Sequence, residues 1–147
     1  MTEGAATPRA VLLDTDAFSF LHRGGPAAEP FRSVVEHHIP LLSFITVGEL
    51  LRGALQRGWG ESKRTQLQVR IDAMTVVPYD EIVISAYAEV TAWAVANGHP
   101  LGQAAHSNDA WIAATAVAHG VPLVTGNLRH FVGCPRLTVL PDPPDAG

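Results

Sequence analysis

The sequence contains a single cysteine, Cys134, and no long apolar run. One cysteine excludes an intramolecular disulfide and a metal site built from several thiolates. Sparse cysteine is typical of a reducing compartment, so we expect a cytoplasmic protein. No apolar run approaches the ~20 residues that cross a bilayer, and the first ten residues, MTEGAATPRA, lack the cationic start and apolar core of a secretory signal. We therefore expect no membrane partner.

Charged residues are also scarce. They make up 16% of the 147 residues, and the formal net charge is −4. A protein with this balance does not coat nucleic acid by bulk electrostatics, so a nucleic-acid role needs a local basic patch or a metal ion. Hydrophobic residues make up 47% of the chain, which is enough for one domain with its own core and excludes a disordered or fibrous protein.

Short apolar runs alternate along the chain with longer segments of helical periodicity. The predicted strands are residues 10–14, 40–44, 75–78, 123–125 and 137–140. The predicted helices are residues 15–23, 29–38, 46–56, 61–73, 80–97 and 108–119. This pattern predicts an α/β fold: a single domain over residues 10–140, with a central parallel sheet of about five strands flanked by helices. Residues 1–9 and 141–147 are interpreted as flexible tails.

Three acidic residues follow three different predicted elements. Asp14 ends the first strand, and Glu49 and Asp109 each lie at the start of a predicted helix. Each acid also has a purely structural interpretation. Asp14 fits a helix N-cap, Glu49 completes a capping box with Thr46, and Asp109 complements the dipole of a helix capped by Asn108.

The three acids together are less easily explained by capping. The carboxyl ends of parallel strands, and the helix starts that follow them, share one edge of a sheet, so Asp14, Glu49 and Asp109 are expected to converge. Clustered carboxylates repel one another unless a cation lies among them. Ligands that are all oxygen suit Mg²⁺ or Mn²⁺, which support phosphate chemistry. Thr125 and Asn127 follow the fourth strand and can orient a carboxylate, a water or an ion there.

Four segments resemble the PIN domain, and more narrowly the toxin ribonucleases of VapBC toxin–antitoxin pairs. They are Val-Leu-Leu-Asp14-Thr-Asp16, Thr-Val-Gly-Glu49-Leu, Asn-Asp109-Ala-Trp-Ile-Ala-Ala-Thr-Ala and Leu-Val-Thr125-Gly-Asn127-Leu-Arg-His-Phe131. The resemblance covers roughly residues 10–140. It implies an Mg²⁺-dependent endoribonuclease, with Mn²⁺ as a substitute, that cuts tRNA or rRNA at single-stranded loops and so inhibits translation. It also implies a homodimer and a cognate antitoxin that neutralises the enzyme.

The resemblance also implies roles for individual residues. Three acids match the family's catalytic and metal-binding positions: Asp14, Glu49 and Asp109. The supporting candidates are Thr15, Asp16, Thr125 and Asn127. The family often has a fourth acid at the position of Asn127 or a few residues beyond, where this chain has Asn127 and His130, which argues against a tightly bound second ion. His106 is interpreted as a structural or surface residue, with contact to the substrate or a hydrogen bond to an acid as the alternative.

Basic residues cluster in one part of the chain. Five of the ten Lys and Arg residues lie between positions 52 and 70, where they can steer an RNA backbone. Arg52 and Arg57 are the candidate RNA-binding residues, and Arg52 is expected to pair with Glu49 or to reach a phosphate. A solvated helical face is the alternative for the others. Trp59 is interpreted as a core or interface residue, with base stacking as the alternative.

Three other classes of protein are alternatives to this interpretation. A signalling receiver domain needs a lysine after the last strands, and the only lysine here is Lys63. Flap-type DNA nucleases are usually longer and carry a helical arch. A catalytically idle PIN-fold module that acts through protein or RNA contacts remains the alternative: the three acids argue against it, and Asn127 argues for it.

Overall fold

The first strand, β1 (Arg9–Leu13), lies in the middle of the sheet because its side chains are apolar on both faces. Val11, Leu12 and Leu13 are fully buried. Val11 and Leu13 belong to one core cluster and Leu12 to another, as expected for a strand that is covered on both sides. The computed structural model describes residues 9–141.

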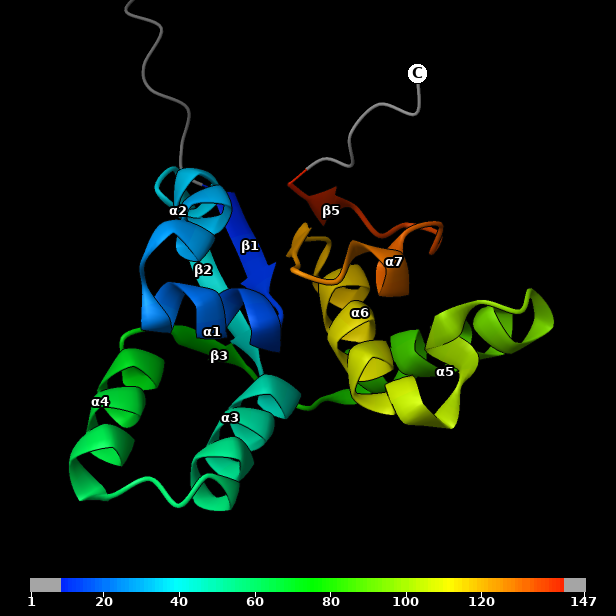
Figure 1. Cartoon of the computed structure of the whole chain (residues 1–147). Helices are drawn as coiled ribbons and strands as arrows, with labels where there is room; N and C mark the ends of the chain where they lie inside the picture. The colour runs from blue at the N-terminus through cyan, green and yellow to red at the C-terminus, as the bar shows by residue number, and fades with distance from the viewer. Residues whose placement is uncertain (1–8, 142–147) are drawn as a thin grey trace, which may run out of the picture.

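The sheet has five parallel strands in the order β3-β2-β1-β4-β5, which confirms the predicted α/β fold (Figure 1). The other strands are β2 (His38–Ser43), β3 (Thr75–Val77), β4 (Leu123–Val124) and β5 (Val139–Leu140). The chain moves outwards from β1 through β2 to β3, then returns to the other side of β1 for β4 and β5. The strand order therefore reverses between β1 and β4, the place where open α/β sheets bind ligands.

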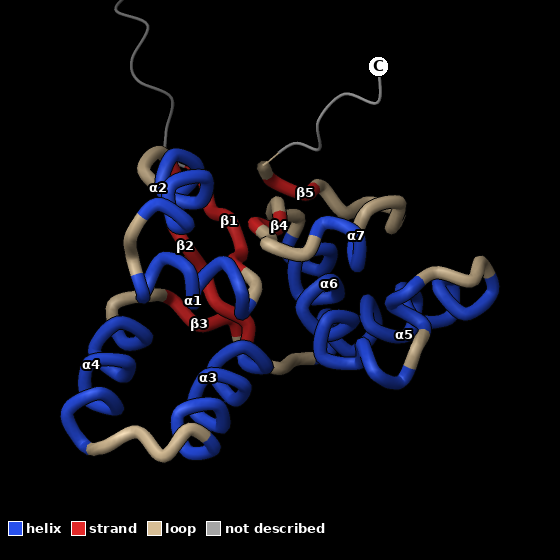
Figure 2. The backbone as a smooth tube through the Cα atoms, viewed as in Figure 1, coloured by secondary structure: helices blue, strands red, loops and turns tan. Residues whose placement is uncertain are grey.

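One face of the sheet carries the helices that follow β1 and β2. They are α1 (Thr15–Arg23), α2 (Glu29–Val35), α3 (Phe44–Gln56) and α4 (Glu61–Asp72). Their shared core contains Phe18, Phe31, Leu50 and Leu67. Figure 2 shows that α3 and α4 project beyond the sheet and are joined by a short loop.

The opposite face carries α5 (Glu81–Ala96), α6 (Ser107–His119) and α7 (Leu128–Phe131), gathered on one side in Figure 1. Four alanines of α6 are at most 1% exposed, and three of them, Ala110, Ala113 and Ala116, belong to the core cluster on this face. Their small side chains let α6 pack closely against the sheet and α5. This packing fixes the position of the first turn of α6, which carries Asp109.

Several predicted boundaries are wrong by a few residues. The predicted helix 29–38 ends at Val35, because His38 already pairs with β1. Helix α3 begins at Phe44 rather than at Thr46, because Ser43 caps it. Arg9 lies in β1 rather than in a tail. The rest of the predicted N-terminal tail, and all of the C-terminal one except Pro141, lie outside the described residues.

Three short 3₁₀ helices were not predicted: η1 (Pro26–Ala28), η2 (Pro100–Gly102) and η3 (Ala104–His106). Three-residue elements are too short for a readable periodicity. Two of them, η2 and η3, link α5 to α6 and so lead into the turn that carries Asp109. None of the helices within residues 9–141 is long and apolar enough to cross a membrane.

Candidate active site

Asp14 is a buried carboxylate at the reversal of strand order. It follows β1 directly and caps α1: its Oδ1 accepts a hydrogen bond from the Ala17 backbone N–H at 2.7 Å. Its Oδ2 accepts one from the Thr125 hydroxyl, which follows β4. The residue is 3% exposed. The predicted N-cap role of Asp14 is therefore confirmed. Because a capping side chain normally lies in solvent, capping alone does not explain why Asp14 is buried.

Burial raises the pKa of Asp14 from its ordinary value of 3.8 to about 6. The hydrogen bonds from Thr125 and Ala17 lower this pKa in part, and the nearby charges of Asp16 and Asp109 raise it further. No cationic side chain within residues 9–141 forms an ion pair with Asp14. A buried carboxylate among other acids, without a protein cation, fits a site for a bound cation.

Glu49 reaches the same edge from α3. The Thr15 hydroxyl donates a hydrogen bond to Glu49 Oε1 at 2.7 Å and lies 3.3 Å from the Thr46 hydroxyl. The capping box predicted for Thr46 and Glu49 is wrong: Ser43 caps α3, so Thr46 is buried inside the helix and Glu49 lies in its second turn. The contact of Thr46 with the Thr15 hydroxyl was not predicted, because the spacing of Thr46 and Glu49 also fits a capping box.

Asp109 comes from the first turn of α6, as predicted, but Asn108 does not cap that helix. Instead, Asp109 Oδ2 lies 2.9 Å from His130 Nδ1 and 3.5 Å from His106 Nδ1. His106 is near this acid, but no hydrogen bond joins the two, so the alternative role of His106 stays a prediction. Asp109 shares no hydrogen bond with Asp14, but it is close enough for its charge to raise the pKa of Asp14.

Asn127 and Asp16 close the other side of the site. The Asn127 backbone N–H donates to the Thr125 hydroxyl oxygen at 2.8 Å, and the Asn127 side-chain amide donates to Asp16 Oδ2. Thr125 therefore accepts from Asn127 while it donates to Asp14. Asp16 is exposed. The turn after β4 is thus tied both to the buried acid and to the first turn of α1.

A groove of about 370 Å³, here called the acid-lined groove, lies between α1, α3 and α4; two candidate acids, Asp16 and Glu49, line it, whereas Asp14 and Asp109 do not. Its lining includes Thr15, Asp16, Glu49, Arg57 and Trp59. The Arg57 guanidinium carbon lies 5.8 Å from the centre of the Trp59 ring, within the range of a cation–π contact.

Arg52 does not line this groove, whereas Arg57 does. It is exposed and forms no ion pair with Glu49, although both residues are among those the structure describes. The predicted pairing of Arg52 with Glu49 is therefore wrong, whereas contact with a phosphate stays a prediction.

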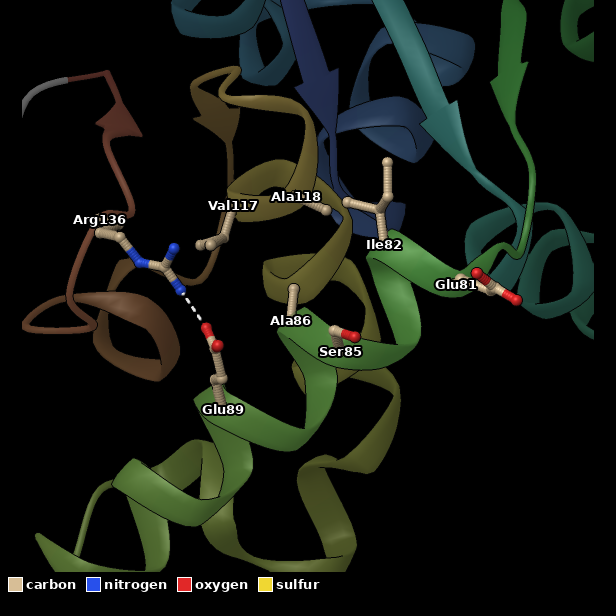
Figure 3. Close-up of a pocket in the computed structure, with 8 residues that line it drawn as sticks. All are labelled: Glu81, Ile82, Ser85, Ala86, Glu89, Val117, Ala118 and Arg136. Atoms are coloured by element: carbon tan, nitrogen blue, oxygen red, sulfur yellow. Dashed lines mark hydrogen bonds and ion pairs between the residues drawn. The ribbon is translucent and has the colours of Figure 1, made fainter.

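A second groove, of about 410 Å³, lies between α5, α6 and the segment before β5 (Figure 3). Its charged pair is Arg136 with Glu89, whose nitrogen and oxygen atoms are 2.6 Å apart. None of the predicted site residues lines it. Although this groove is slightly larger, the candidate acids Asp16 and Glu49 line the acid-lined groove and none lines this one.

The acid site has donor atoms of the type that a hard dication takes, although among the described residues the ligand atoms of Asp14, Glu49 and Asp109 do not all lie within 4.8 Å of one another. Asp14, Glu49 and Asp109 offer carboxylate oxygens, the ligands that Mg²⁺ and Mn²⁺ accept. The hydrogen bonds to Asp14 leave each of its oxygens a second lone pair. Glu49 Oε2 accepts no hydrogen bond from the described residues.

Comparisons with known proteins agree with this fold. A model of the PIN domain family matches residues 11–132. The VapC ribonuclease Y4jK of Sinorhizobium fredii is 34% identical over 134 residues, which span 82% of this chain and 89% of that relative. The chain therefore belongs to the PIN domain family, and its curated relatives include VapC ribonucleases.

Two solved complexes share the architecture. VapBC2 from Rickettsia felis, bound to a DNA fragment from its promoter, superposes with a TM-score of 0.75 and 19% identity, over 88% of this chain and 96% of that chain. VapBC from Salmonella typhimurium, also bound to DNA, has a TM-score of 0.69 and 27% identity over the same shares. The first likeness, at 19% identity, bears on the fold alone.

The raised pKa of Asp14 has a consequence for stability. Between pH 3.8 and about 6 the folded protein holds a proton that the unfolded chain has lost, so the free energy of unfolding of the metal-free protein falls as the pH rises through this window. Asp14→Asn removes the buried charge. We expect the variant to be about 1 to 3 kcal/mol more stable than wild type near pH 8 and to converge with it below about pH 4.

Urea unfolding in EDTA at both pH values measures this difference. Glu36→Gln, which removes an exposed acid, is the matched control and should change stability by less than about 0.5 kcal/mol. An Asp14→Asn variant that is no more stable than wild type near pH 8 would contradict the burial of an ionised carboxylate.

Proposed function

We propose that this chain is a metal-dependent endoribonuclease toxin whose catalytic acids are Asp14, Glu49 and Asp109. The observation that carries the proposal is the buried Asp14 carboxylate at the strand reversal, which has Asp16 and Asp109 nearby and no ion-pairing cation among residues 9–141. Membership of the PIN domain family and the relatives named VapC ribonuclease support RNA as the substrate. By the same resemblance, single-stranded loops of tRNA or rRNA are the proposed targets, and translation is the process inhibited.

In this proposal, Asp14 and Asp109 hold Mg²⁺, and Glu49 binds it directly or through water. Mn²⁺ is the substitute ion. When bound, such an ion neutralises charge on a phosphodiester and favours the attack of water on phosphorus. The chain positions the ligands: Thr125 and the Ala17 N–H fix the Asp14 carboxylate, and Thr15 holds Glu49 through Oε1, which would leave Oε2 to bind the ion. Asn127 supports this arrangement through Thr125.

The acid-lined groove is the proposed path of the RNA strand. Arg57, which follows the last residue of α3, lines the groove and places positive charge there, and Arg52 lies on α3 three residues after Glu49. Trp59 is half-buried in the groove and offers a surface on which a base can stack. The positive charges of Arg52 and Arg57 attract phosphate locally, whereas the net charge of −4 on the whole chain repels it.

We also propose a cognate antitoxin as the protein partner, a homodimer as the assembly and the cytoplasm as the site of action. The VapBC complexes with the same fold support an antitoxin partner. Ile82 and Tyr79, 59% and 55% exposed at the start of α5, offer apolar surface for self-association. Light scattering on the purified chain tests the dimer, and a mass of one 15.6 kDa chain would contradict it.

Replacing Asp14 by Asn should abolish RNA cleavage while the fold is retained. The amide cannot supply the charge that an ion needs, so we expect the rate to fall at least about a hundredfold. The measurement is cleavage of total cellular RNA by the purified chain with Mg²⁺, with Mn²⁺ and with EDTA, followed by end mapping of the products.

Glu89→Gln is the matched control, because Glu89 is an exposed acid outside the site; it should cut like wild type. Cleavage that persists in EDTA or in Asp14→Asn would refute the proposed mechanism. A folded wild-type chain that cuts no RNA with either ion would favour the idle binding module instead.

Replacing Arg57 by Ala should weaken RNA binding in an uncleaving Asp14→Asn background. Loss of one phosphate contact should reduce affinity about three- to tenfold and flatten the salt dependence by about 0.7 in log–log slope. Fluorescence anisotropy with a labelled single-stranded RNA at several salt concentrations measures both. Arg136→Ala, which removes a cation beside the second groove, should leave affinity and slope unchanged; equal losses in the two variants would argue against the groove as the RNA path.

A further inference from the structure

The cluster of His106, Asp109 and His130 has features that the proposed phosphate chemistry does not use. Both imidazoles direct Nδ1 at the same oxygen, Asp109 Oδ2, at 3.5 and 2.9 Å. The ring centroids are 4.4 Å apart. The three side chains are 25 to 30% exposed, so an ion from solvent can reach them.

Three separate elements hold this cluster in place. His106 ends η3, and Asp109 lies one turn later in α6, so the two residues share a face of the chain. His130 comes from α7, which is anchored by Phe131, a core residue that is 1% exposed. The two histidines therefore come from separate elements and lie side by side at Asp109, and the packing of those elements brings the three residues together.

The spacing of the ligand atoms matches a coordination shell. An ion with bonds of about 2.0 to 2.1 Å separates neighbouring ligand atoms by about 3.0 Å in octahedral and about 3.4 Å in tetrahedral geometry. The observed contacts to Asp109 Oδ2 are 2.9 and 3.5 Å, and ligand atoms of all three residues lie within 4.8 Å of one another. Only small side-chain rotations are needed to bring all three to one ion.

We propose that His106, Asp109 and His130 form a binding site for a transition-metal dication of the Zn²⁺ type. Two imidazole nitrogens and one carboxylate oxygen suit Zn²⁺ and similar first-row ions, whereas Mg²⁺ takes oxygen ligands. Three protein ligands leave positions open to water. The site is distinct from the proposed all-oxygen site, with which it shares Asp109.

Sharing Asp109 gives the site a regulatory consequence, which rests on the proposed ribonuclease function. A Zn²⁺ ion on the two histidines draws the Asp109 carboxylate away from the ion held with Asp14. Zn²⁺ at stoichiometric levels is therefore expected to inhibit Mg²⁺-supported RNA cleavage. Variants that lack one histidine are expected to resist this inhibition.

Calorimetric titration of the full chain, without a histidine tag and in excess Mg²⁺, tests the site with Zn²⁺ as the probe. We expect one Zn²⁺ per chain, with the affinity lowered at least about tenfold in His106→Ala and in His130→Ala. His119→Ala, which removes an exposed histidine at the end of α6, should bind Zn²⁺ like wild type. Asp14→Asn, which weakens the competing Mg²⁺ site, should bind Zn²⁺ at least as tightly as wild type.

The outcomes separate this inference from the proposed function. Zn²⁺ binding that survives both histidine substitutions, or that is lost in Asp14→Asn, would overturn the histidine site. Asp14-dependent RNA cleavage without any histidine-dependent Zn²⁺ binding would overturn the site and leave the ribonuclease standing. Histidine-dependent Zn²⁺ binding in a chain that cuts no RNA would support the site and count against the ribonuclease. Circular dichroism of each variant confirms that it is folded.

Discussion

The buried carboxylate of Asp14 is the constraint on which the rest of the site depends. It lies between the ends of two neighbouring strands, held by the Ala17 N–H on one oxygen and by the Thr125 hydroxyl on the other. Burial opposes its ionisation, and the acids around it oppose it further. Folding therefore buries a negative charge that no cation among the described residues pairs with, which lowers the stability of the metal-free protein. Such a loss of stability is typical of functional sites, here a site for a bound cation.

The parallel sheet makes this arrangement possible. Because the strand order reverses between β1 and β4, the residues after both strands meet at one point, and α3 and α6 add Glu49 and Asp109 to the same edge. Small alanines bring α6 close to the sheet, and η2 and η3 set its start. The acids thus come from separate elements whose relative positions are fixed by the packing of both cores.

Sequence patterns were sufficient for the sheet and for the residues that follow its strands. Asp14 and Thr125 were predictable because apolar strands are short and end at a defined residue. The start of α3 was not, since Phe44 and Ile45 continue the apolar run of β2 and hide the cap at Ser43. The contact of His130 with Asp109 spans 21 residues and depends on how α7 packs against α6, which local periodicity does not encode.

The central claim is that the buried Asp14 carboxylate is a ligand for a bound cation. The most direct test is NMR titration of the ¹³C-labelled Asp14 carboxyl in the full chain, with and without Mg²⁺. The metal-free protein should titrate with a pKa of about 6, and saturating Mg²⁺ should shift this pKa well below its ordinary value of 3.8. A metal-free pKa near 3.8, or a pKa that Mg²⁺ leaves unchanged, would contradict the account.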